Sequence, residues 1–147
     1  MRHRLVIGVH LVITDHRGHV LLGLRPATAA FGALQWHVPA GHLEDESAQQ
    51  CAVREAHEEL GIGIDPDALH LLHTLHQRNP DNGHARLQLF FGVDRYTGHI
   101  ANCEPDRCVA LQWWPPDALP ASIVPYTAGA LAAITAGVIY AEAGWTT

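Results

Sequence analysis

The sequence predicts a mixed α/β (α+β) fold in a chain of 147 residues. Apolar stretches of strand length lie on both sides of a capped helical segment. These strand candidates are residues 4–14, 19–24, 69–76, 86–93 and 110–114. The first two are expected to pair as a hairpin. With 48% hydrophobic residues the chain can fill one core, so we expect a single domain spanning residues 1–147.

The central helix is predicted over residues 48–60 because both of its ends carry cap signals. Ser47 with Gln50 three residues later forms a capping box, and Gly61 stands where a left-handed C-terminal cap is expected. Apolar residues recur every fourth position and predict the face that packs on the core. These residues are Ala48, Ala52, Ala56 and Leu60.

Three carboxylates share a second face of this helix. Glu55, Glu58 and Glu59 follow i, i+3, i+4 spacing, which places them side by side. Like charges this close repel, and a cation, an arginine or open water must offset the cost. Oxygen ligands of this kind suit Mg²⁺ or Mn²⁺, and magnesium is commonly shared between protein carboxylates and substrate phosphates. The alternative is a solvated acidic surface.

The segment around these acids resembles the signature of the Nudix (MutT-like) hydrolase family. Residues 54–62, Arg-Glu-Ala-His-Glu-Glu-Leu-Gly-Ile, match the second half of the signature without a gap, and Glu46 stands at the position of its first acid. The first half is one residue short, because only four residues separate Gly41 from Glu46, and Asp45 occupies the place of a common glycine. Counting from Gly41 instead would put Ser47 at the acid position; helical register favours Glu46.

The resemblance covers nearly the whole chain and implies a fold and an activity. The implied fold is a mixed β-sheet sandwiched between helices. The implied activity is metal-dependent hydrolysis of the pyrophosphate linkage of a nucleoside diphosphate joined to another group, as in a nucleoside triphosphate, an oxidised nucleotide or a nucleotide sugar. The implied cofactor is Mg²⁺ or Mn²⁺, because cations offset phosphate charge and lower the pKa of a bound water.

The resemblance also implies site residues. The expected catalytic residues are Glu55, Glu58, Arg54 and Glu46. The expected metal ligands are Glu55, Glu58, Glu59, the carbonyl of Ala40 and Glu104. Glu55 or Glu58 would serve as general base, and Arg54 would orient the acids through Glu46, because a guanidinium can hold a carboxylate bidentately. Asp106 competes with Glu104 for its role, and Arg25 is expected to contact substrate phosphate.

A second hypothesis is a non-catalytic nucleotide-binding module of the same family. The one-residue contraction before Glu46 motivates it. The substrate itself is left open, because we expect base recognition to come from two variable loops, residues 26–35 and 77–85, and neither carries a pattern that identifies a base.

Charge and cysteine content exclude other classes. A formal net charge of −6, with nine arginines and no lysine, argues against binding a nucleic acid polymer. Three unevenly spaced cysteines do not form a disulfide framework, so we expect a cytoplasmic protein. Cys103 and Cys108 lack a matching pair of zinc ligands. His70, His73 and His76 lie in a predicted strand, which scatters them over both faces.

Residues 118–141 contain no Asp, Glu, Lys or Arg, but prolines and glycines dilute their apolarity and argue against a membrane span. We expect instead a core helix from Pro125 to about residue 140, because proline is favoured in the first helical turn. Its apolar residues spread widely around the axis, which makes a homodimer a further expectation.

Overall fold

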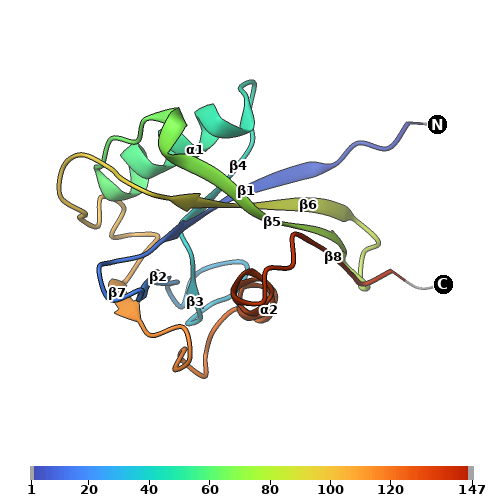
Figure 1. Ribbon diagram of the computed structural model, residues 1–147. Coiled ribbons are helices and arrows are strands. Elements are labelled where there is room, and N and C mark those ends of the chain that lie inside the picture. The colour runs from blue at the N-terminus through green and yellow to red at the C-terminus, as the bar shows by residue number, and fades with distance from the viewer. Residues whose placement is uncertain (1, 146–147) are drawn as a thin grey trace.

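A five-stranded mixed sheet forms the centre of the computed structural model, which describes residues 2–145 (Figure 1). In spatial order its strands are β4 (Ala40–His42), β1 (Val6–Ile13), β6 (Ala85–Val93), β5 (Leu69–Arg78) and β8 (Tyr140–Ala143). β1 runs parallel to β6 and β5 parallel to β8, whereas β1 with β4 and β5 with β6 are antiparallel. The sheet is therefore mixed, as expected.

A second, antiparallel sheet contains β3 (Trp36–His37), β2 (Val20–Leu24) and β7 (Ala110–Trp114). The expected hairpin of β1 and β2 is only partly correct. The turn forms, since the Asp15 N–H donates to the His19 carbonyl at 3.0 Å, and an isolated bridge joins Thr14 to Val20. Beyond that bridge the two strands separate into different sheets, because each has longer ladders with other partners.

Helix α1 (Ala48–Leu60) has the predicted bounds and caps. The Ser47 hydroxyl accepts from the Gln50 N–H at 3.1 Å, and the Gln50 side chain accepts from the Ser47 N–H at 2.8 Å. Gly61 adopts φ 70°, which glycine reaches without steric cost. A short 3₁₀ helix, η1 (Pro66–Ala68), then leads into β5. The local cap signals therefore sufficed to place this helix.

Helix α2 (Pro125–Thr135) is shorter than predicted. Pro125 begins it as expected, but the chain turns at Gly137, which has φ 74°, and the Val138 N–H donates to the Ala133 carbonyl at 2.9 Å. The residues that follow form β8 along the outer edge of β5. The prediction of helix to about residue 140 was wrong because β5 offers these residues a ladder of backbone hydrogen bonds.

Each face of the five-stranded sheet packs on one helix (Figure 1). One core joins the buried side of α1 to one face of β1 and β6, the other joins α2 to the opposite face, and the second sheet contributes residues to both. Neighbouring residues alternate between the cores: Leu11 and Phe91 lie on the α1 side, and Val12 and Phe90 on the α2 side. The predicted arrangement of a mixed sheet between helices is confirmed.

The histidines of β5 are scattered, as predicted. His73 is buried and hydrogen-bonded to the Val138 carbonyl at 2.7 Å, whereas His70 is exposed beside Asp94 and His76 packs on Trp145. In residues 2–145 no helix combines the length and apolarity needed to cross a bilayer.

Two other histidines, His10 on β1 and His37 on β3, lie in the α2-side core. Burial lowers the pKa of His10 to about 4 and lowers the pKa of His37 well below its ordinary value. Both rings are therefore neutral in the folded protein at neutral pH.

Acidification should destabilise the fold through these rings. The unfolded chain protonates His10 below about pH 6.5 while the folded chain resists until about pH 4, so unfolding takes up a proton between these values. We expect the stability advantage of wild type over His10→Asn to shrink by about 2 kcal/mol between about pH 7 and about pH 5. Urea unfolding of both proteins measures it, and a constant difference would contradict the assignment.

Candidate active site

Arg54 is the centre of the acidic cluster on α1. Its guanidinium binds Glu46 bidentately, with Nη2–Oε1 at 2.6 Å and Nε–Oε2 at 3.0 Å. Nη1 reaches Glu55 at 2.9 Å and Glu58 at 3.2 Å. One cation thus joins three carboxylates, two from α1 and one from the loop before it. Ser47 caps the helix and Glu46 contacts Arg54. These contacts favour Glu46 over Ser47 as the first acid of the signature.

These contacts divide the carboxyl groups electrostatically. Hydrogen bonds from Arg54 lower the pKa of Glu46 to about 2. Burial raises the pKa of Glu55 despite its contact with Arg54. Burial, together with the negative charges of Glu55 and Glu104, raises the pKa of Glu59 to about 8. Arg54 therefore stabilises the ionised form of Glu46, whereas burial disfavours the ionised forms of Glu55 and Glu59.

Gly41 makes room for one of these acids. A Cβ atom on residue 41 would lie 2.0 Å from Cδ of Glu55 and 2.1 Å from its Oε1. The glycine belongs to β4, whose pairing with β1 fixes the backbone, so Glu55 packs directly on the strand. This close approach explains how Glu55 can be buried and still border a cleft.

Glu104 is brought to the site by the end of α1. The last carbonyl groups of a helix lack partners within it. Here the N–H groups of Ala101 and Cys103 donate to the Leu60 and Glu59 carbonyls, each at 3.0 Å. The loop therefore crosses the end of the helix, and the next residue, Glu104, lies near the Glu59 carboxyl group.

These residues border a cleft of about 610 Å³, which we call the acidic cleft. Five acidic side chains line it: Glu44, Glu55, Glu59, Glu104 and Asp106. Ala40 and Arg25 also line it, so the cleft brings together the predicted phosphate contact and the predicted metal ligands other than Glu58. Glu46, Arg54 and Glu58 lie outside its lining. Arg54 binds Glu46 and Glu58 and is connected to the cleft by its ion pair with Glu55.

The donor set fits a hard divalent cation. The candidate ligands are all oxygens, and a cation would offset the negative charge that burial and the neighbouring acids disfavour on Glu59. Within residues 2–145, no three Asp, Glu, His or Cys side chains already stand in a geometry that would hold a metal ion.

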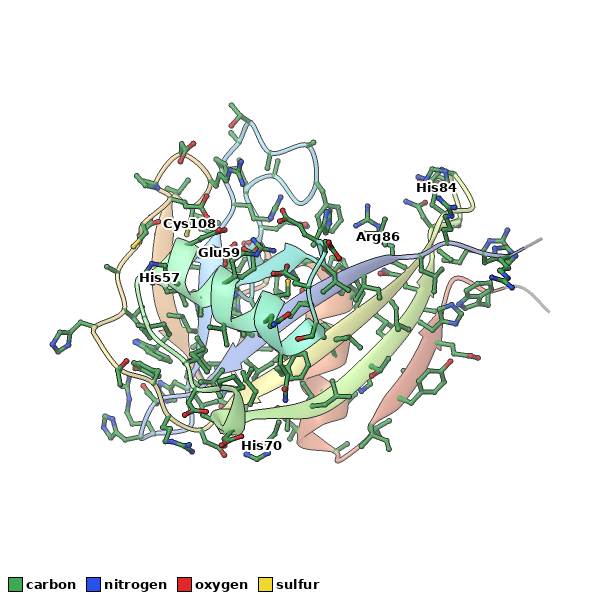
Figure 2. All side chains as sticks on the ribbon, turned by 90° about the horizontal axis from the view of Figure 1, so that it is seen from above. His57, Glu59, His70, His84, Arg86 and Cys108 are labelled. Carbon is green, nitrogen blue, oxygen red and sulfur yellow. The ribbon has the colours of Figure 1, made fainter. Side chains whose placement is uncertain are left out.

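A second cleft, of about 650 Å³, adjoins the first and was not predicted from the sequence. The two share five lining residues: Arg25, His37, Ala40, Gly41 and His42. Arg86 and His84 line the second cleft, and Figure 2 shows them on the part of the molecule away from Glu59 and Cys108, which line the acidic cleft. Its residues come from distant strands and loops, so no local pattern could have revealed it. The two loops predicted to recognise the base, residues 26–35 and 77–85, both contribute to it.

Comparison with known proteins identifies the class of molecule. The model of the NUDIX domain family matches residues 4–134. The chain is 39% identical over 80 residues to an 8-oxo-dGTP diphosphatase of Proteus vulgaris, a match covering 54% of this chain and 68% of that protein.

Solved structures agree. A MutT NUDIX hydrolase from Burkholderia pseudomallei superimposes with a TM-score of 0.78 and 28% identity, covering 88% of this chain and 98% of that one. The E. coli ORF135 protein superimposes with a TM-score of 0.74 and 30% identity, covering 90% of each chain. This chain therefore belongs to the Nudix family, as a MutT-like pyrophosphohydrolase.

Replacing Gly41 with alanine should displace Glu55, because the added methyl group would overlap its carboxyl group. We expect Gly41→Ala to lower kcat/KM for nucleotide hydrolysis by about a hundredfold. Gly129→Ala is the matched control: Gly129 lies in α2 with open space at its Cβ, and alanine there should stabilise the helix by about 0.5–1 kcal/mol. Equal activity of the two variants would show that Glu55 is not held against residue 41.

Proposed function

We propose that the chain is a metal-dependent hydrolase that cleaves the pyrophosphate linkage of a nucleoside diphosphate joined to another group. For a nucleoside triphosphate, water would add to a phosphorus of the linkage, the P–O bond of the bridge would break, and a nucleoside monophosphate and pyrophosphate would leave. The Proteus vulgaris relative is an 8-oxo-dGTP diphosphatase, which makes oxidised nucleoside triphosphates the first substrates to test.

One observation carries this proposal: Glu55, Glu59 and Glu104 border the same cleft as Arg25 and the Ala40 backbone. The acids come from a helix and from a loop 45 positions beyond Glu59, so their meeting is a property of the fold. Arg25 has no carboxylate partner within residues 2–145, and these acids beside it form a site with both signs of charge. A cation and a phosphate chain together match such a site.

The side chains then take separate roles. Glu55, Glu59 and Glu104, with the Ala40 carbonyl, would hold Mg²⁺ or Mn²⁺, which when bound offsets phosphate charge and acidifies a water. Arg25 would orient the phosphate chain. Of the two candidate bases we favour Glu55, because Glu55 lines the cleft and Glu58 does not.

Arg54 would act indirectly. It reaches Glu55 and Glu58 while holding Glu46, so it would set the position of the helix acids relative to the loop. The second cleft opens from the shared wall at Ala40 and Gly41, and it offers space for the nucleoside once the phosphates occupy the acidic cleft.

The activity should depend on both metal and substrate. Purified protein stripped with a chelator is expected to release no pyrophosphate from 8-oxo-dGTP, and Mg²⁺ or Mn²⁺ should restore release. A panel including dGTP, ADP-ribose and a dinucleoside polyphosphate would rank the substrates by kcat/KM. Absence of turnover on the whole panel with either metal would overturn the proposed function.

Removing the charge of Glu59 should separate activity from stability. Glu59→Gln is expected to reduce turnover by at least about a hundredfold, since a neutral amide binds a cation poorly. The same change should raise the Tm of the metal-free protein, by a difference that grows as the pH rises from 4.5 to about 8 and then stays constant, because the folded protein disfavours the charged form of Glu59. Glu142→Gln, at an exposed position, serves as the control. A Glu59→Gln protein with wild-type turnover would remove Glu59 from the site.

A further inference from the structure

The second cleft rests on a chain of buried hydrogen bonds that links three elements. His10 Nδ1 lies 3.1 Å from the Leu89 carbonyl oxygen, and His10 Nε2 lies 2.9 Å from the Tyr126 hydroxyl. The same hydroxyl lies 3.3 Å from His37 Nε2, and His37 Nδ1 lies 2.6 Å from the Thr127 hydroxyl. β1, β3 and α2 thus meet at one phenolic oxygen.

The chemistry of the groups fixes the direction of every hydrogen bond. A carbonyl only accepts, so His10 carries its proton on Nδ1, and its bare Nε2 accepts the Tyr126 proton. The Tyr126 oxygen then accepts from His37, which must carry its proton on Nε2. A neutral His37 has a bare Nδ1, which accepts the Thr127 proton. The two histidines therefore hold opposite tautomers, and each nitrogen has a partner.

This network of hydrogen bonds connects the two sheets at the wall between the clefts. His10 is the strand partner of Ala40 in the five-stranded sheet, and His37 belongs to the second sheet and lines both clefts. Tyr126 lines the second cleft, with its ring 5.6 Å from the ring of His10 and 5.5 Å from that of His37. Without the hydroxyl, two buried ring nitrogens would lose their common partner.

We propose that Tyr126 and Thr127 are positioning residues of the substrate site: through the two histidines they hold the floor of the second cleft in the shape that binds the part of the substrate away from the reacting phosphates. The inference rests on the proposed function, since it assigns the second cleft to that part of the substrate. Neither Arg54 nor any acid of α1 takes part in these four hydrogen bonds. Loss of the hydrogen bonds of Tyr126 or Thr127 should therefore weaken substrate binding and leave the chemical step unchanged.

Tautomer states can be read without any substrate. In ¹⁵N-labelled wild-type protein at about pH 7.5, where an ordinary imidazole is neutral, two-bond ¹H–¹⁵N correlation spectra distinguish protonated from bare ring nitrogens. The expected result is protonation on Nδ1 of His10 and on Nε2 of His37. Protonation of both rings on the same nitrogen would contradict the hydrogen-bond network, whatever the enzyme hydrolyses.

The kinetic test removes single hydroxyl groups. Tyr126→Phe and Thr127→Val are expected to raise KM about tenfold with kcat within about twofold of wild type. Thr127→Ser, which keeps the donor, should restore KM. Tyr140→Phe deletes the same atom from an exposed tyrosine whose hydroxyl donates to Glu142, and it should match wild type.

The outcomes separate the two proposals. A KM for Tyr126→Phe equal to that of Tyr140→Phe, or equal losses in Thr127→Val and Thr127→Ser, would overturn the positioning role. A fall in kcat at unchanged KM would mean that these hydrogen bonds act in the chemical step, and it would also overturn the positioning role. If Tyr126→Phe fails to fold, the Thr127 pair and the wild-type spectra decide. If the proposed function fails, the nucleotide panel shows no turnover while the spectra still report the tautomers.

Discussion

A single guanidinium, that of Arg54, makes the acidic end of this molecule possible. Carboxylates on one turn of a helix and on the loop before it would repel one another, and Arg54 binds Glu46, Glu55 and Glu58 together. Its fork fixes the loop to the helix, so the loop keeps its position although it is one residue shorter than the family signature. The arginine makes no ion pair with Glu59, whose carboxyl group lines the cleft together with that of Glu104. The fold thus contains one group of acids that Arg54 binds and, in Glu59, a largely buried acid that Arg54 does not bind.

The backbone of residues 36–42 has a second organising role. It leaves the smaller sheet at β3 and joins the larger one at β4, and four of its residues line both clefts as part of the wall they share: His37, Ala40, Gly41 and His42. Acidic side chains dominate one side of that wall, whereas Arg78 and Arg86 border the other. In the proposed function, the metal-bound phosphate chain and the attached nucleoside have different chemical requirements, and this division of charge would provide for both. The neutral histidines at the wall keep its buried side free of charge.

The accuracy of sequence-based prediction followed the range of the interactions involved. α1 was predicted with the correct bounds because the capping box, Gly61 and the four-residue apolar repeat all act within a few residues of one another. The end of α2 and the separation of β1 from β2 were mispredicted, because each depends on a ladder with a strand far away in sequence. The meeting of Glu104 with Glu59 depends on carbonyl groups at the end of a helix more than forty positions earlier.

The sequence by itself determined the family and the acidic helix, because these rest on residue types at fixed spacing, and the family resemblance implied the pairing of Glu46 with Arg54 that the structure contains. Only the tertiary structure decided which acids share a cleft, and it revealed the second cleft and the hydrogen bonds of Tyr126. The physical reason is that hydrogen bonds, burial and pKa values depend on the distance between side chains in space. Chain folding sets that distance for residues such as His10, His37 and Tyr126, and their order in the sequence carries no record of it.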